Sequence, residues 1–168
     1  MQPGMVPEPG LAVQPARFGA KDVQDLGQKN LLDAFSCTEC GRCSAACPAQ
    51  HTGKLLSPRR IMMRTRDRME DLAKLPIDQR ANDGKSLLHD YISVEELRAC
   101  TTCQACVQEC PVSINPLDII MQLRRYQIME ESQAPAEWTA MFGNVENNFA
   151  PWKLSPDERD KWTEGLSN

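Results

Sequence analysis

The chain has 168 residues, of which 41% are hydrophobic, and its 23 acidic and 19 basic side chains give a formal net charge of -4. This length suits one compact domain with tails, and the acidic balance argues against a nucleic-acid-binding protein. No apolar stretch is long enough to cross a bilayer, so we expect no direct membrane insertion.

The first 27 residues are rich in proline and glycine, and this composition predicts an extended N-terminal arm at 1–27. The arm could be mobile, or it could lay its apolar side chains on a partner; these are Met5, Val6, Leu11, Val13 and Phe18. A short helix with one apolar face is expected from Gln28 to Phe35, and it leads the chain to Cys37.

A first cysteine run follows this helix and reads C-x2-C-x2-C-x3-C-P, with Cys37, Cys40, Cys43 and Cys47. After the run, Ser57 and Pro58 predict the start of a longer helix that reaches about Leu75. A capping residue there precedes proline at the first helical position, where the missing N–H costs nothing.

The expected helix at 58–75 has a narrow apolar stripe of Met62, Thr65, Met69, Leu72 and Ala73. Its other face carries Arg59, Arg60, Arg64, Arg66 and Arg68. This arginine face predicts either a solvated surface partly paired with Asp67, Glu70 and Asp71, or a docking patch for an acidic partner or cofactor.

Residues 76–91 are polar and include the turn signal Asn82-Asp83-Gly84, so they predict a surface loop or a small hairpin. Ser93 and Glu96 then form a capping-box pattern, which predicts a short helix leading to the next cysteine.

A second cysteine run repeats the spacing of the first after 63 residues, with Cys100, Cys103, Cys106 and Cys110. Asn115 and Pro116 predict another capped helix, which reaches about Glu131 and is apolar around most of its circumference. The chain therefore contains an internal repeat of short helix, cysteine run, loop and capped helix.

From about Ser132 the helical periodicity fades, and 132–168 is expected to be an irregular C-terminal tail. It contains large aromatic side chains, namely Trp138, Phe142, Phe149, Trp152 and Trp162. Because a disordered tail is usually poor in aromatics, we expect this one to pack on its own domain or on a partner protein.

The spacing of both runs is that of [4Fe–4S] ligands in bacterial two-cluster ferredoxins, where the fourth cysteine binds the other cluster. We therefore expect one cluster to be held by Cys37, Cys40, Cys43 and Cys110. The other would be held by Cys100, Cys103, Cys106 and Cys47. With four cysteine ligands, neither cluster offers an open iron to a substrate, so the site is expected to be non-catalytic.

Disulfides and zinc are the weaker uses of eight cysteines. Disulfide frameworks are typical of short secreted chains, and zinc usually takes its ligands as separated pairs. His51 and His89 are expected to be ordinary polar residues, since the cysteines already complete two clusters. Reduced, metal-bound cysteines indicate the cytoplasm, or the cytoplasmic face of a membrane reached through a partner.

The stretches FSCTECGRC, LSPRRIMM, ACTTCQAC and NPLDII resemble the α-helical ferredoxin domain, and above all (Fe–S)-binding proteins like the C subunit of heterodisulfide reductase. The resemblance covers the chain from about Leu26 to Trp152. It implies a mostly α fold: an α-helical ferredoxin domain at 28–131, built of two helix–cluster–helix repeats, with extended tails on both sides.

The resemblance implies an electron-transfer subunit that relays single electrons through two [4Fe–4S] clusters in a heterodisulfide-reductase-like oxidoreductase complex. Implied partners are a CCG-motif protein like the B subunit of heterodisulfide reductase and, as a further candidate, a flavoprotein. The aromatic side chains of the tail, rather than the resemblance, predict that 132–168 docks on the larger redox subunit. The alternatives are an iron–sulfur subunit of a membrane-bound quinone-linked dehydrogenase, an enzyme with an open iron site, and a redox-sensing regulator.

Overall fold

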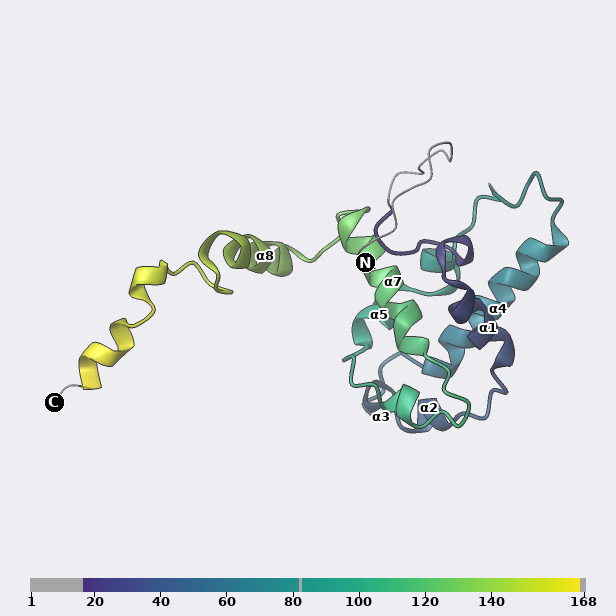
Figure 1. Cartoon of the computed structure of the whole chain (residues 1–168), viewed down its shortest axis with the longest axis horizontal. Coiled ribbons are helices and arrows are strands. Elements are labelled where there is room, and N and C mark those ends of the chain that lie inside the picture. The colour runs from purple at the N-terminus through teal and green to yellow at the C-terminus, as the bar shows by residue number, and fades with distance from the viewer. Residues whose placement is uncertain (1–16, 82, 167–168) are drawn as a thin grey trace, which may run out of the picture. The chain divides into compact units, whose positions relative to one another are not determined.

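The computed structural model describes residues 17–81 and 83–166, which belong to two compact units divided between Glu131 and Ser132. The first unit contains η1 (Val23–Asp25), α1 (Gln28–Ser36), α2 (Arg42–Ala45), α3 (Pro48–His51), α4 (Pro58–Lys74), η2 (Leu87–Tyr91), α5 (Val94–Ala99), α6 (Ala105–Gln108) and α7 (Pro116–Met129). The second contains α8 (Ala136–Asn148), η3 (Pro156–Glu158) and η4 (Lys161–Leu166). Figure 1 shows these helices, and the described residues contain no β-strand. The expected mostly α fold is confirmed.

The core of the first unit lies where α4 and α7 pack together. Ile61 and Met62 of α4, and Ile119, Ile120 and Leu123 of α7, are at most 1% exposed. Burial stabilises such side chains by about 1.5–3 kcal/mol each, so these two helices hold the repeats together. Figure 1 shows the short helices α2 and α3 at one end of the longer ones.

Two helix starts have the side-chain caps that their sequences predict. In α5, Ser93 Oγ accepts from the Glu96 N–H at 3.2 Å, and Glu96 Oε2 accepts from the Ser93 N–H at 3.0 Å. In α7, Asn115 Oδ1 accepts from the Asp118 N–H at 3.1 Å. These caps begin the two helices that flank the second cysteine run.

The start of α4 is capped differently from the prediction. Ser57 precedes Pro58 as expected, but its side chain makes no cap hydrogen bond. Its hydroxyl lies 2.8 Å from the Ser44 hydroxyl, and Ser44 Oγ accepts from the Arg59 N–H at 3.3 Å. The prediction of Ser57 as a side-chain cap was therefore wrong, because Ser44, on α2, satisfies this helix start instead.

The N-terminal segment is packed where the structure describes it. Ala20, Val23 and Leu26 are buried, and the Ala20 N–H donates to Gln122 O of α7 at 3.0 Å. Gly19 has a φ of +77°, and a Cβ there would lie 2.3 Å from Gln122 O, so this contact requires glycine. The loose arm expected from composition does not extend through this segment. Outside the described residues lie Met5, Val6, Leu11 and Val13.

Arg68 ties the N-terminal segment and the loop after α4 to that helix. Its side chain is 1% exposed. Its guanidinium donates to Asp22 Oδ1 at 2.9 Å, to Asp83 Oδ1 at 2.9 Å and to the Lys85 carbonyl at 2.7 Å. Hydrogen bonding to Arg68 lowers the pKa of Asp83 to about 2. The expectation that Arg68 belongs to a solvated face was wrong, because two carboxylates from other segments compensate its buried charge.

Other arginines of the expected face also pair within the unit. Arg64 Nη1 lies 2.6 Å from Glu96 Oε2, and Arg66 pairs with Glu39. These arginines do not pair with the predicted partners Asp67, Glu70 and Asp71. Their carboxylate partners lie on α5 and on the first cysteine loop rather than on α4 itself. Exposed positions of the face are Arg59 and Arg60.

The loop expected at 76–91 is polar only in part. Leu87 and Leu88 are completely buried, and an isolated bridge joins Leu88 to Ile92. No hairpin strands are present in the described residues of this loop, so the prediction of a small hairpin was wrong. Two leucines in the core anchor its end.

The second unit differs from the irregular tail that the sequence predicts. It contains α8, which follows Pro135 and has no side-chain cap at its start. Its aromatic side chains are between 40% and 78% exposed; they are Trp138, Phe142, Phe149, Trp152 and Trp162. Among the described residues of this unit, Ala150 alone is buried.

Candidate iron–sulfur site

The two cysteine runs have the same backbone conformation at equivalent positions. Glu39 and Thr102 have φ values of 58° and 57°, and Gly41 and Gln104 have φ values of 83° and 63°. A left-handed conformation costs a non-glycine residue roughly 1–2 kcal/mol, so both loops hold strained residues. Turns of this kind can direct successive backbone N–H groups toward a bound anionic group.

Helices on either side position the cysteines of each run. α1 and α5 end immediately before Cys37 and Cys100, which cap them in an extended conformation. α2 and α6, which contain Cys43 and Cys106, pack against each other. The third cysteines of the two runs are thereby brought to the same part of the fold, so the repeats face each other as their spacing predicts.

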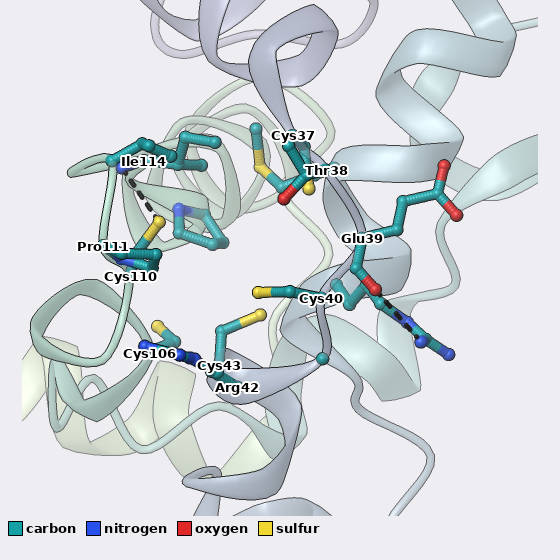
Figure 2. Close-up of a pocket in the computed structure, with 15 residues that line it drawn as sticks. Cys37, Thr38, Glu39, Cys40, Arg42, Cys43, Cys106, Cys110, Pro111 and Ile114 are labelled. Atoms are coloured by element: carbon teal, nitrogen blue, oxygen red, sulfur yellow. Dashed lines mark hydrogen bonds between the residues drawn. The ribbon is translucent and has the colours of Figure 1, made fainter.

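Two pockets lie among the cysteines, and each is lined by cysteines of both runs. The first is lined by Cys37, Cys40, Cys43, Cys106 and Cys110. Figure 2 shows Cys40 and Cys43 on one side of this space and Cys106 and Cys110 on the other. The second is lined by Cys47, Cys100, Cys103 and Cys106. All eight cysteines that the sequence singles out therefore line a pocket, and Cys106 lines both.

Backbone N–H groups donate to sulfur in both sets. The Thr102 nitrogen lies 3.4 Å from Cys100 Sγ, and the Ile114 nitrogen lies 3.3 Å from Cys110 Sγ. Figure 2 marks the hydrogen bond between Ile114 and Cys110 with a dashed line. Hydrogen bonds of this kind stabilise negative charge on a thiolate, and they are one of the factors that set the potential of an iron–sulfur cluster.

Burial disfavours free thiolates at two of the cysteines. It raises the pKa of the Cys106 thiol to about 11, and the nearby Cys100 adds to this shift. It also raises the pKa of Cys43. Iron carries positive charge and binds the deprotonated sulfur, so a cluster would supply the compensation that the polypeptide alone does not give.

The donor set fits [4Fe–4S] clusters. All eight cysteines are free of disulfide bonds, and each pocket has at least four of them in its lining. Within the described residues, no three His, Cys, Asp or Glu side chains are grouped closely enough to hold one metal ion. A cubane cluster makes no such demand, because its four cysteines bind four different irons.

Comparison with known families agrees with this chemistry. Residues 36–114 match the family described as "4Fe-4S dicluster domain". The chain carries a 4Fe-4S dicluster domain. It holds two [4Fe–4S] clusters, as the eight cysteines in two runs predict.

Three relatives extend the match beyond the dicluster domain. The chain is 32% identical over 176 aligned positions to "Probable iron-sulfur-binding oxidoreductase FadF" of Bacillus subtilis, covering 86% of this chain and 25% of that protein. It is 32% identical over 167 positions to "EtfAB:quinone oxidoreductase" of Syntrophomonas wolfei, covering 86% and 23%. It is 36% identical over 105 positions to the C subunit of the ferredoxin/F(420)H(2)-dependent CoB-CoM heterodisulfide reductase of Methanosarcina acetivorans, covering 62% and 52%. The chain thus spans about a quarter of the first two relatives and about half of the third.

The dicluster domain has two arginines at its first pocket that the sequence analysis did not assign to the site. Arg42 and Arg59 both line that pocket. Arg42 directly precedes a cysteine of the run, so its position in the motif was the available signal. Neither His51 nor His89 lines either pocket, and His89 Nε2 instead lies 2.9 Å from Glu131 Oε2.

Proposed function

We propose that this chain is an electron-transfer subunit that relays single electrons within a larger oxidoreductase complex. The observation that carries the proposal is the pair of adjacent pockets whose linings include all eight cysteines. Each [4Fe–4S] cluster, when bound, accepts and donates one electron. Four cysteine ligands leave no iron free for a substrate, so the residues of this site hold, insulate and tune the clusters.

The proposal includes crossed ligand sets. One set is Cys37, Cys40, Cys43 and Cys110, and the other is Cys100, Cys103, Cys106 and Cys47. Support comes from the linings, because Cys110 lines the first pocket and Cys47 the second, although each belongs to the opposite run. Each cluster would then bridge the two repeats.

The complex proposed for this subunit is heterodisulfide-reductase-like. Relatives named as C subunits of heterodisulfide reductases support this assignment, with 28–36% identity over 62–69% of this chain. The proposed partners are a CCG-motif protein like the B subunit of heterodisulfide reductase and a flavoprotein, both at the cytoplasm or at the cytoplasmic face of a membrane. In the described part of the chain, no helix is both long enough and apolar enough for a membrane span.

A second candidate is the iron–sulfur subunit of a membrane-bound, quinone-linked dehydrogenase. The relative named "EtfAB:quinone oxidoreductase" and another named "Probable membrane-anchored ferredoxin", of Chromohalobacter salexigens, support it. In both candidates this chain performs the same one-electron relay, and they differ in the protein that receives the electron.

The second unit is proposed as the docking element of this subunit. Several of its large aromatic side chains are mostly exposed, namely Phe149, Trp152 and Trp162. Aromatic side chains are the commonest anchors of protein interfaces, and exposed apolar groups on a protein usually mark a contact site. A relay subunit also needs a partner held near its clusters.

The test of the proposed function is anaerobic reduction of the full chain with its iron and sulfide in place. The chain should take up about two electrons, return them to an oxidant, and show EPR signals of two interacting reduced clusters. Stoichiometric zinc without labile sulfide, or clusters that cannot be reduced reversibly, would exclude an electron-transfer role.

A further inference from the structure

The two cysteine pockets differ in charge. The first is lined by Arg42 and Arg59, whereas none of the described residues that line the second has a charged side chain. The second lining is completed mainly by apolar groups such as Leu56, Leu117 and Ile120. Two pseudo-symmetric sites thus have different electrostatic surroundings.

The arginine charges at the first pocket are not cancelled by its one acidic side chain. Glu39 also lines this pocket, but its carboxylate pairs with Arg66. Arg59 Nη1 donates instead to the Glu39 carbonyl at 3.5 Å and lies within 3.7 Å of the position of a Cβ on Gly41. Its guanidinium is therefore held directly against the loop between Cys40 and Cys43.

The two ligand sets also differ in burial. Cys47 and Cys106, of the second set, are 6% and 8% exposed, whereas no cysteine of the first set is buried. Contact with water stabilises a negatively charged cluster, and a dry apolar lining does the opposite. Burial and charge therefore both favour the reduced, more negative cluster at the first site over the second.

Other contacts do not reverse this difference. A backbone N–H donates to a cysteine sulfur in each set, at Thr102 in the second set and at Ile114 in the first. On the side of the second set, Arg124 donates to the carbonyl oxygens of Leu97 and Cys100, but it does not line the pocket.

We propose that Arg42 and Arg59 raise the reduction potential of the first cysteine site above that of the second, so that the first site holds the first electron to enter. Adding one electron makes a cluster and its four thiolates more negative by one charge, and nearby cations stabilise that reduced form. The inference rests on the proposed electron-transfer function and adds the order in which the two sites are reduced.

The test is an anaerobic EPR-monitored redox titration of the full chain, wild type against Arg59→Gln and Arg42→Gln. Each substitution should lower the upper of the two midpoint potentials and leave the lower one in place. We expect a threefold to tenfold change in the reduction equilibrium, which is ~30–60 mV at 59 mV per tenfold for one electron. The shift should shrink at high salt, because both arginines are exposed.

Two further variants separate charge from packing. Arg59→Lys keeps the charge and should retain most of the wild-type upper potential. Arg60→Gln removes another exposed charge, which lies outside the pocket lining, and it should move neither potential. A fall of the lower potential, equal shifts of both, or no difference between Arg59→Gln and Arg60→Gln would overturn the inference with the proposed function intact. Absence of any reversible reduction would overturn both.

Discussion

Arg68 lies almost wholly out of water while donating to carboxylates from two other segments. Replacing it by methionine would leave Asp22 and Asp83 facing each other without their cation. Since breaking a buried ion pair costs about 3–5 kcal/mol and these carboxylates are slightly exposed, we expect a loss of roughly 3 kcal/mol in the free energy of unfolding. Denaturant titration of the anaerobic protein measures this loss.

Arg60→Met is the matched control for that change, because Arg60 is an exposed arginine of the same helix. It should stay within ~0.5 kcal/mol of wild type. Equal stabilities of the two methionine variants would show that the Arg68 network does not hold the N-terminal segment and the loop to α4.

At the scale of one residue, alanine substitutions at Gly19 and Gly53 distinguish the cost of backbone conformation from the cost of lost space for a side chain. Both have positive φ values, of 77° and 75°, but a Cβ at Gly19 would overlap Gln122 O, whereas nothing lies within 4 Å of one at Gly53. Gly53→Ala should therefore cost only about 1–2 kcal/mol for its conformation. Gly19→Ala should cost clearly more, measured as the difference in melting temperature. Similar losses for both would mean that the N-terminal segment can move away from α7.

At the scale of whole elements, the sequence predicted those helix starts whose capping residues lie close together in the chain. The capping box at Ser93 and Glu96 and the Asn115 cap depend on residues three apart, so the sequence alone predicts them. The Ser57 cap failed because its hydroxyl bonds to Ser44, thirteen residues away. Such a choice between partners depends on tertiary packing, which no local pattern contains.

Two elements were missed for related reasons. The packed N-terminal segment contains η1, whose start has a capping box of Asp22 and Asp25 that proline-rich composition obscured. α8 follows Pro135 without a side-chain cap, so it carries no start signal of the usual kind. By contrast, the spacing of the cysteines predicted all eight that line the pockets. Cluster ligands must lie at fixed separations along the chain, so the sequence shows them directly.

The second unit yields a prediction about docking. Phe149→Ala combined with Trp152→Ala removes two exposed aromatic side chains and should weaken co-purification of the partner proteins at least tenfold, since interface anchors of this kind contribute about 2 kcal/mol or more each. Iron content should stay at the wild-type level.

The control is Lys153→Ala, which alters the exposed side chain next to Trp152 in the sequence and leaves every aromatic ring in place. Truncation after Glu131 provides the larger test. Loss of clusters from the truncated chain, with partner binding retained, would mean that the second unit protects the clusters rather than docking.

At the scale of the whole molecule, the repeats are joined in two ways. α4 and α7 pack through their buried faces, and the pockets at one end draw thiols from both cysteine runs. If each cluster takes its fourth ligand from the opposite run, the clusters act as cross-links between the repeats, and cluster loss would loosen the whole domain. Crossed ligand sets are therefore our central claim.

Iron content of two double variants tests that claim most directly. Both variants contain Cys40→Ala, at an exposed cysteine of the first run, and each replaces one further cysteine. With crossed sets, Cys40→Ala with Cys110→Ala removes two ligands of the same cluster, so about four iron and four sulfide should remain per chain. Cys40→Ala with Cys47→Ala then removes one ligand from each cluster, and far less iron should remain. The opposite order, with iron retained in the Cys47 variant and lost in the Cys110 variant, would show that each run holds its own cluster and would contradict the account.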